Sequence, residues 1–175
     1  MQVLKINEEV YLQVSDRFSE LCLMLLPSLN ITLAKTRESA SQGLSVSVRS
    51  NLGAGDSTSM ASLEGSFGLE QLSGGQRSLV SLALLVAAAQ EGSHSSVILL
   101  DEVDAALDEV NQALVARLLR VFSHSHGAQV ICVSHNKAFQ QICDAIINIA
   151  RDGDSGGSVV CAQKAEKRYD CMSLE

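Results

Sequence analysis

Apolar residues near the amino terminus follow first a helical and then an extended pattern. Between residues 10 and 25 they recur three or four positions apart, in the stripe Val10, Val14, Phe18, Leu21, Cys22 and Leu25. This spacing predicts a helix that begins near Ile6 and runs to about Pro27, with one apolar face. Farther on, residues 31–33 and 44–48 carry apolar side chains at every second position, which predicts two strands that each bury one face.

The second half of the chain alternates between apolar helical segments and short apolar runs. The predicted elements are helix Arg77–Gln90, strand Val97–Leu100, helix Asn111–Phe122, strand Val130–Val133, helix Lys137–Cys143, strand Ala145–Ile149 and a returning hairpin strand Val159–Ala162. The first two strands are continuous apolar runs, typical of strands buried on both faces of a parallel sheet. This order predicts an α/β fold class, mainly a parallel sheet flanked by helices.

Composition divides the chain into three parts. We expect a helix over residues 1–27, one α/β lobe over residues 28–163 and a charged tail over residues 164–175. Within the lobe, residues 51–68 are rich in Gly and Ser and poor in apolar residues, which predicts a loop or insertion. Its glycines are compatible with a phosphate cradle, but no Lys follows them, so a plain loop is the better interpretation.

The composition of the 175 residues narrows the class of protein. Hydrophobic residues make up 46% of the chain, enough for a core, and the net charge of −7 argues against a dedicated nucleic-acid surface. The longest apolar stretch, Leu79–Ala89, is too short to span a membrane. No apolar signal segment opens the chain, and the five cysteines show no C-x-x-C spacing. We therefore expect free thiols in a reducing cytosol or nucleus.

One candidate site follows the first buried strand, where residues 97–102 read VILLDE. This is the Walker B pattern, in which an apolar run fixes the carboxyl end of a strand at the sheet edge where ligands bind. Asp101 would hold Mg²⁺ through a water, because this ion keeps much of its hydration shell. Glu102 would orient or deprotonate an attacking water. Taken alone, the pattern also arises by chance at strand ends.

A second and more specific pattern is QLSGGQRSL at residues 71–79. Ser73 offers a hydroxyl and a helix N-cap, while Gly74 and Gly75 have no side chains and let backbone N–H groups approach a phosphate closely. The following helix directs the positive end of its dipole at the same anion. An ordinary Ser-capped helix after a Gly turn is the simpler interpretation. Five residues in this order, followed by Walker B, favour phosphate binding.

Two further residues stand near these patterns. His135 follows the strand Val130–Val133, so its imidazole would also lie at a strand's carboxyl end, within reach of a γ-phosphate and an attacking water. Asp108 follows Walker B in the segment AALD. It would either cap the helix Asn111–Phe122 or reach across a dimer interface, and the spacing alone does not choose between these two roles.

Three segments resemble the ABC-type ATPases, and within them the SMC family of chromosome-organising proteins: LSGGQRSLVSLAL, LLDEVDAALD and VSH. They look like the signature motif, Walker B with its D-loop, and the switch histidine of a carboxy-terminal head lobe. The upstream FSELCLMLLPSLNITLA is similar to SMC sequence where the coiled coil re-enters the head. LLP, LSGGQRSL and LDEVDAALD most resemble the condensin-type subunit, whereas VSH departs from it and leaves a bacterial-type or cohesin-type SMC as alternatives.

The resemblance implies a role for each candidate residue in ATP hydrolysis. Asp101 looks like the magnesium aspartate, Glu102 like the catalytic glutamate and His135 like the switch histidine. The signature residues Ser73, Gly74, Gly75 and Gln76 would contact the γ-phosphate of ATP bound on the opposite head. Asp108 looks like the D-loop aspartate at the head–head interface.

The resemblance also implies partners, because the chain has no G-x-x-x-x-G-K-[ST] phosphate loop. An amino-terminal lobe of the same protein would supply that loop, and residues 1–27 would be the end of the returning coiled coil. A second SMC head, a kleisin subunit and DNA would complete the assembly. The expected location is the nucleus and chromosome, or the cytoplasm and nucleoid in a bacterium, with no membrane contact.

Other classes of protein fit parts of the same sequence. A transporter nucleotide-binding domain usually carries the phosphate loop in the same chain, which disfavours it here. A repair ATPase shares the split head and differs only in flanking sequence. A non-catalytic lobe that binds a kleisin is disfavoured by the intact Asp101, Glu102 and His135. We expect the chain alone to be inactive as an ATPase.

Overall fold

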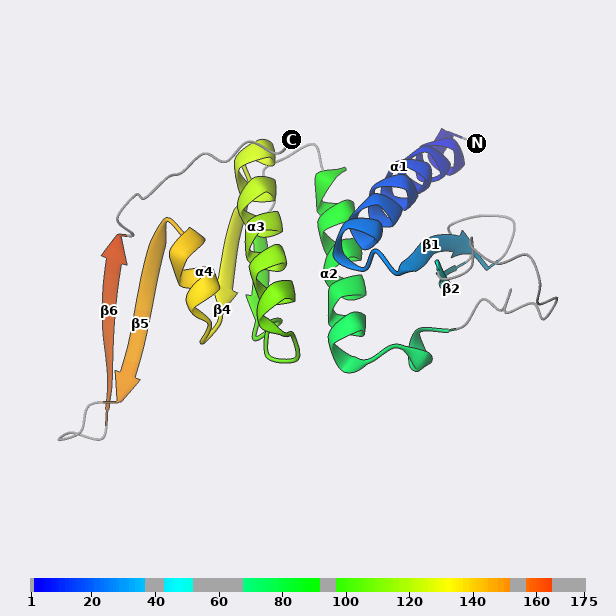
Figure 1. The fold of residues 1–175 in the computed structure, drawn as a ribbon. Coiled ribbons are helices and arrows are strands. Elements are labelled where there is room, and N and C mark those ends of the chain that lie inside the picture. Colours follow the sequence, from blue (N-terminus) through cyan, green and yellow to red (C-terminus); the bar gives the residue numbers. More distant parts are fainter. Residues whose placement is uncertain (1, 37–42, 52–67, 92–96, 152–156, 165–175) are drawn as a thin grey trace.

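The computed structural model describes residues 2–36, 43–51, 68–91, 97–151 and 157–164, and the structural statements below refer to these residues. In chain order the elements are α1 (Gln2–Leu25), β1 (Leu29–Lys35), β2 (Leu44–Ser50), the 3-10 turn η2 (Leu69–Gln71), α2 (Gly74–Gln90), β3 (Val97–Asp101), α3 (Glu109–His126), β4 (Gln129–Val133), α4 (Lys137–Ile142), β5 (Ala145–Arg151) and β6 (Ser158–Lys164) (Figure 1). Every predicted helix and strand is present. Most of the predicted loop 51–68 and of the tail 164–175 lies outside the described residues.

Capping explains where the helices begin and end. The predicted start of α2 at Arg77 is wrong by three residues, because Ser73 caps the helix and Gly74 is its first residue. Asp108 caps α3 and starts it at Glu109, and Gly127, with φ of 60°, ends it in the left-handed conformation that glycine adopts without steric cost. The amino-terminal helix begins at Gln2 rather than near Ile6.

The strands form three separate pairs. β1 pairs with β2 and β5 pairs with β6, both antiparallel, while β3 and β4 are parallel. The α/β class is confirmed, but the expected mainly parallel sheet is limited to one pair of the described strands. Short connections explain the two antiparallel pairs, because a parallel pair needs a crossover of a dozen or more residues, as the connection through α3 provides for β3 and β4. The predicted hairpin return of the last strand is confirmed.

The pair β3–β4 is buried on one face, not on both as the sequence predicts. Ile98 and Leu100 are buried in the core. The other face carries Val97, Leu99, Ile131 and Val133, with exposed fractions of 60%, 70%, 47% and 53%. We call these four residues the open face. An apolar run predicts that both faces of a strand are buried, but it does not indicate which polypeptide packs against each face.

The core joins α1, β1–β2, α2, α3 and the buried face of β3. Within the predicted stripe of α1, Phe18, Cys22 and Leu25 are fully buried, whereas Val10 is 41% exposed. The stripe therefore leaves the core toward the amino terminus of α1, which lies at the edge of the molecule (Figure 1). Alternate residues of β1 are buried as predicted, and β2 buries Val48. None of the described helices combines the length and apolarity that a membrane span requires.

Candidate active site

The parallel pair β3–β4 brings two candidate residues together at its carboxyl edge. Asp101 is the last residue of β3 and is in register with Val133, the last residue of β4. The Glu102 N–H donates to the Val133 carbonyl oxygen at 3.0 Å, which ties the two strand ends together. Beyond them, Nε2 of His135 lies 3.5 Å from Oε1 of Glu102. The two residues expected at separate strand ends thus share one site.

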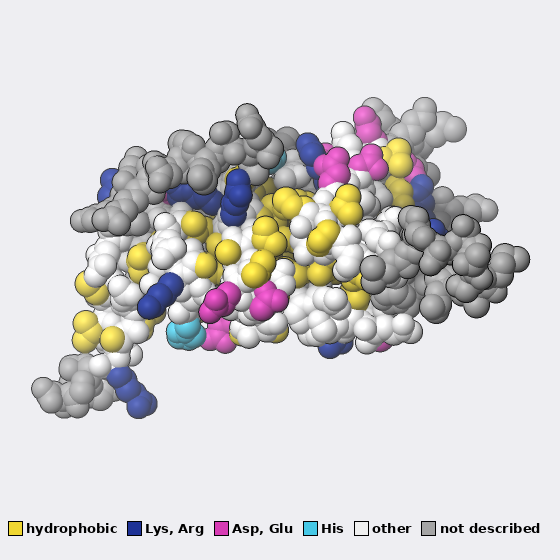
Figure 2. All heavy atoms as spheres, in the orientation of Figure 1, with side chains coloured by type: hydrophobic (Ala, Val, Ile, Leu, Met, Phe, Trp, Pro, Cys, Tyr) yellow, Lys and Arg dark blue, Asp and Glu magenta, His cyan; other side chains and the backbone are white. Residues whose placement is uncertain are grey.

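Both members of this pair are open to solvent. The His135 side chain is 91% exposed and that of Glu102 is 56% exposed. Figure 2 shows a histidine among acidic side chains at the lower edge of the molecule, below α3 and α4. Groups this exposed are accessible to a ligand from outside the chain, and contacts with that ligand would order them further.

The backbone of Glu102 is strained. Its φ is +47°, and it is the only non-glycine residue with a positive φ in the described part of the chain. Such a conformation costs roughly 1–3 kcal/mol and occurs preferentially at functional sites. The sequence gives no sign of it, because glutamate has no preference for this conformation.

The turn after Glu102 contains a buried carboxylate that sequence reasoning missed. Asp104 is 6% exposed, and the Ser134 hydroxyl donates to its Oδ2 at 2.7 Å. The Asn136 N–H in turn donates to Ser134 Oγ at 2.9 Å. The turn that carries Glu102 is therefore bonded to the segment that carries His135. The available sequence signal was the presence of polar residues in DEVDAALD and VSHN, which follow two predicted parallel strands.

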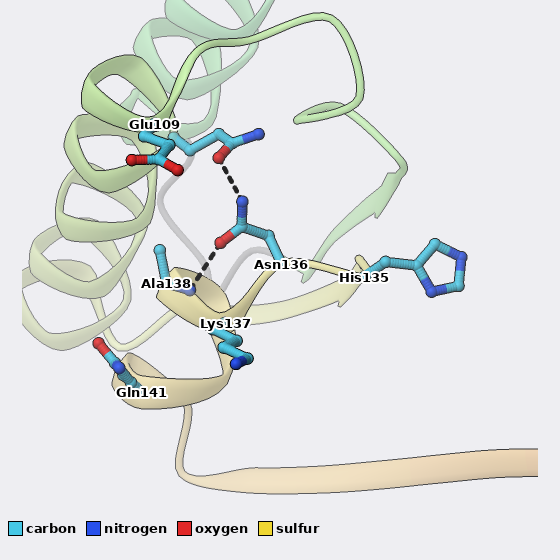
Figure 3. Close-up of a pocket in the computed structure, with 7 residues that line it drawn as sticks. Glu109, His135, Asn136, Lys137, Ala138 and Gln141 are labelled. Carbon is cyan, nitrogen blue, oxygen red and sulfur yellow. Dashed lines mark hydrogen bonds between the residues drawn. The ribbon is translucent and has the colours of Figure 1, made fainter.

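A second set of bonds connects the same two segments through α3. Gln112 Nε2 donates to the carbonyl oxygens of Leu107, at 2.9 Å, and Asp104, at 3.2 Å. Its Oε1 accepts from Asn136 Nδ2, and Asn136 Oδ1 accepts from the Ala138 N–H at 2.7 Å, which caps α4. Gln112, Asn136 and Ala138 line a hollow of about 430 Å³ together with His135. Figure 3 shows the Asn136 side chain directed toward α4 and the His135 ring projecting away from it.

The signature residues form the amino terminus of α2. Ser73 Oγ accepts from the Gln76 N–H at 3.2 Å, and Gln76 Oε1 accepts from the Ser73 N–H at 3.0 Å, which makes a reciprocal capping box. The predicted N-cap role of Ser73 is confirmed. The Gln76 side chain, assigned from the resemblance to a phosphate contact, is engaged here within its own helix.

The two signature glycines have different surroundings. A Cβ added at Gly74 would meet nothing within 4 Å, so open space lies beside the first residue of α2. A Cβ at Gly75 would lie 2.6 Å from the Ala106 carbonyl oxygen. Gly75 thus allows the signature helix to pack against the turn 102–107, whereas the side of Gly74 is open to an anion at the positive end of the helix.

Asp108 caps α3, which is one of its two predicted roles. Its Oδ1 accepts from the Asn111 N–H at 2.8 Å and its Oδ2 accepts from the Asn111 side chain at 3.1 Å. Each carboxylate oxygen has a second lone pair, so the cap does not exclude a further contact.

The acidic groups fit a magnesium ion that arrives with a nucleotide. Among the described residues, no group of three or more His, Cys, Asp or Glu side chains is arranged to hold a metal. Mg²⁺ typically uses one or two carboxylates together with phosphate and water, and the exposed Asp101 can supply one such carboxylate. Burial, with smaller contributions from Asp104 and Asp101, raises the pKa of the Cys132 thiol to about 11, so this thiol stays neutral and is a poor ligand.

Residues 5–155 match the family model described as the RecF/RecN/SMC N terminal domain. The chain belongs to the RecF/RecN/SMC family. The resemblance to SMC proteins seen in the sequence is thereby confirmed at the level of the family.

Curated SMC relatives come from both bacteria and eukaryotes. This SMC chain is 28% identical to the chromosome partition protein Smc of Mycolicibacterium paratuberculosis over 172 residues, which are 97% of this chain and 13% of the relative. It is 36% identical to the structural maintenance of chromosomes protein 1 of Arabidopsis thaliana over 95 residues, 48% of this chain and 8% of that protein. The chain therefore spans a small part of these relatives. These matches show the SMC family and do not resolve the condensin-type subunit from other SMC proteins.

Solved SMC heads have the same fold. The Smc head bound to the C-winged helix domain of ScpA is 25% identical, with a TM-score of 0.74, over 89% of this chain and 44% of that chain. A structure from a study of ATP-driven dimerization and DNA-stimulated activation of SMC ATPases is 24% identical, with a TM-score of 0.70, over 91% of this chain and 89% of that chain. The α/β fold class and its assignment to SMC heads are confirmed.

Proposed function

We propose that this chain is the carboxy-terminal half of an SMC ATPase head, which hydrolyses ATP once an amino-terminal lobe supplies the phosphate loop. The observation that carries the proposal is the Glu102–His135 pair, 3.5 Å apart, directly after Asp101 at the carboxyl edge of a parallel strand pair. A carboxylate and an imidazole at this distance are suited to orienting one water against a γ-phosphate.

Each residue of this edge has a part in the proposed reaction. Glu102 accepts a hydrogen bond or a proton from the attacking water, and His135 donates to the γ-phosphate and steadies the same water. Asp101 would hold Mg²⁺. The ion, when bound, offsets the negative charge of the β- and γ-phosphates. Because both reacting side chains are exposed, they depend on the nucleotide and a facing surface to exclude solvent.

The signature is proposed to act on a different nucleotide, bound to a second head. The open side of Gly74 and the amino terminus of α2 favour an anion there, and the hydroxyl of Ser73 is at the same helix end. Asp108 would lie near the junction between heads while it caps α3. The solved structure concerned with ATP-driven dimerization of SMC ATPases has this fold, which supports the arrangement.

The open face is proposed to contact the amino-terminal lobe. Val97, Leu99, Ile131 and Val133 place an apolar surface on β3–β4 where parallel sheets are normally covered. A kleisin subunit is a further proposed partner, since the similar Smc head was solved with a domain of ScpA. DNA would be bound through the whole complex, on the chromosome of a nucleus or a nucleoid.

The decisive experiment is Glu102→Gln in the full-length protein. Loss of the base is expected to lower ATP turnover at least about 100-fold, the usual contribution of general base catalysis, while ATP binding is retained. Glu91→Gln, at the far end of α2, is the control and should turn over like the wild type. Steady-state phosphate release and nucleotide binding measure the two effects. Turnover of Glu102→Gln near the wild-type rate would refute the proposal.

A further inference from the structure

We propose that Asp104 and Ser134 are positioning residues, which set the distance between Glu102 and His135 without touching the nucleotide. The inference rests on the proposed function of that pair, and it gives a role to two residues for which the sequence motifs suggest none. Asp104 is two residues after Glu102, and Ser134 immediately precedes His135. The hydrogen bond from Ser134 Oγ to Asp104 Oδ2, at 2.7 Å, therefore joins the two short segments that carry the reacting groups.

Packing cannot fix this pair, because the side chains of Glu102 and His135 are 56% and 91% exposed. Their separation depends instead on the backbone that carries them. Beyond the paired residues of β3 and β4, the Glu102 N–H donates to the Val133 carbonyl oxygen and so joins the two strand ends. That bond holds the turn at Glu102, and the Asp104–Ser134 bond holds the same turn two residues later, at Asp104.

The hydrogen bond between Ser134 and Asp104 is of a kind that holds two segments at a constant distance. A buried carboxylate requires donors, since an unsatisfied buried charge is costly. With Asp104 only 6% exposed, the Ser134 hydroxyl is the donor that the structure records for its side chain. A hydrogen bond between a hydroxyl and a charged carboxylate is short and about twice as strong as a neutral one. Stretching it by even a fraction of an ångström is therefore unfavourable.

A closed circuit of hydrogen bonds holds the His135 segment from its other side. Ser134 Oγ accepts from the Asn136 N–H, the Asn136 side chain donates to Gln112, and Gln112 donates to the Asp104 carbonyl oxygen. His135 therefore lies between Ser134, which is bonded to Asp104 in the turn, and Asn136, which is bonded to Gln112 in α3. Figure 3 shows the His135 ring projecting away from Asn136, outside this circuit of bonds.

The test compares Ser134→Ala with Ser134→Thr and Ser123→Ala in the full-length protein. Threonine keeps the hydroxyl and is the conservative rescue. Ser123 is the matched control, because it also is part-buried and donates at 2.7 Å, to the Ala128 carbonyl oxygen. It lies 15 residues along α3 from Asp108, about 22 Å at 1.5 Å per residue. Steady-state kinetics, thermal unfolding and hydrogen–deuterium exchange are measured for each variant.

Ser134→Ala is expected to lower kcat for ATP hydrolysis about 10- to 100-fold, the effect of misplacing reacting groups by a fraction of an ångström to one ångström. KM for ATP should change by less than about twofold, because the nucleotide is not contacted by Ser134. Backbone amides of residues 134–138 should exchange faster, because Asn136 loses its acceptor. Ser134→Thr should restore kcat, and Asp104→Asn, which keeps an acceptor oxygen, should retain more activity than Ser134→Ala.

Three results would overturn the inference: wild-type kcat in Ser134→Ala, a change confined to KM, or a loss of activity matched by the loss of folded protein. The exchange measurement does not depend on turnover, so unchanged exchange at residues 134–138 would also overturn it. Failure of the proposed function looks different, since Glu102→Gln would then hydrolyse ATP like the wild type whatever the Ser134 variants do.

Discussion

Gly74 and Gly75 are adjacent and chemically identical, but the fold uses them differently. The sequence interpretation gives both the same purpose, access of a phosphate to the backbone. The structure separates them: the side of Gly74 is open, whereas Gly75 lies against the Ala106 carbonyl oxygen. Only the second is needed for the packing of this chain. The first is available for a contact with another molecule.

Substituting alanine at each position distinguishes the two roles. Gly75→Ala places a Cβ 2.6 Å from a backbone oxygen, so either α2 or the turn 102–107 must move. Its free energy of unfolding is expected to fall by about 1–3 kcal/mol, as for other overpacked sites. Gly74→Ala should leave stability unchanged or slightly raised, since alanine favours a helix. Denaturant unfolding measures both, and equal destabilisation would contradict the assignment.

At the scale of one element, α3 connects most parts of the candidate site. Its amino terminus is capped by Asp108, its first turns carry Gln112, and its length provides the crossover that makes β3 and β4 parallel. A change at its first turn should therefore reach both the turn 102–107 and the segment of His135. Its last turn, ended by Gly127, is remote from these residues.

Asp108→Ala tests the capping role. Removing the acceptor for the Asn111 N–H is expected to lower the free energy of unfolding by about 0.5–2 kcal/mol. Asp108→Asn keeps an oxygen for the same bond and should be close to the wild type. Thermal unfolding compares the three proteins. If alanine were tolerated as well as asparagine, the 2.8 Å bond would contribute little to the stability of α3.

The sequence predicts every α-helix and strand in the described part of this fold, because apolar periods or continuous apolar runs mark them, but it does not predict the 3-10 turn η2. Helix boundaries were less accurate where a cap decides them, as at Ser73 before α2. The positions of Asp101, Glu102 and His135 at one sheet edge followed from their places after two predicted parallel strands. The φ of Glu102 and the partner of Asp104 did not follow, because they depend on contacts between segments about 30 residues apart.

At the scale of the whole molecule, the two faces of the β3–β4 pair differ in burial. One side of β3–β4 packs into the interior, and the open face presents four large aliphatic side chains to solvent. Strands of this composition are normally covered on both sides when they pair in parallel. The apolar runs of β3 and β4 predict burial on both faces, and a second lobe packed on the open face would account for that pattern.

Leu99→Lys and Val110→Lys compare two aliphatic positions of similar exposure, 70% and 71%, of which only Leu99 is on the open face. Burying an unpaired lysine would cost more than about 1.4 kcal/mol, so Leu99→Lys should weaken binding of a separately produced amino-terminal lobe at least about tenfold. Val110→Lys should bind normally. Titration of the lobes in a sedimentation or fluorescence assay measures the affinity, and equal affinity would exclude the open face from that contact.

The left-handed backbone of Glu102 sets two selective pressures against each other. Glycine or asparagine adopts a φ of +47° at lower cost, so a library screened for folding alone should drift away from glutamate at this position. A library screened for ATP turnover should retain it. Retention of glutamate at a site where stability favours its replacement would therefore indicate, from the selected sequences alone, that this residue takes part in catalysis.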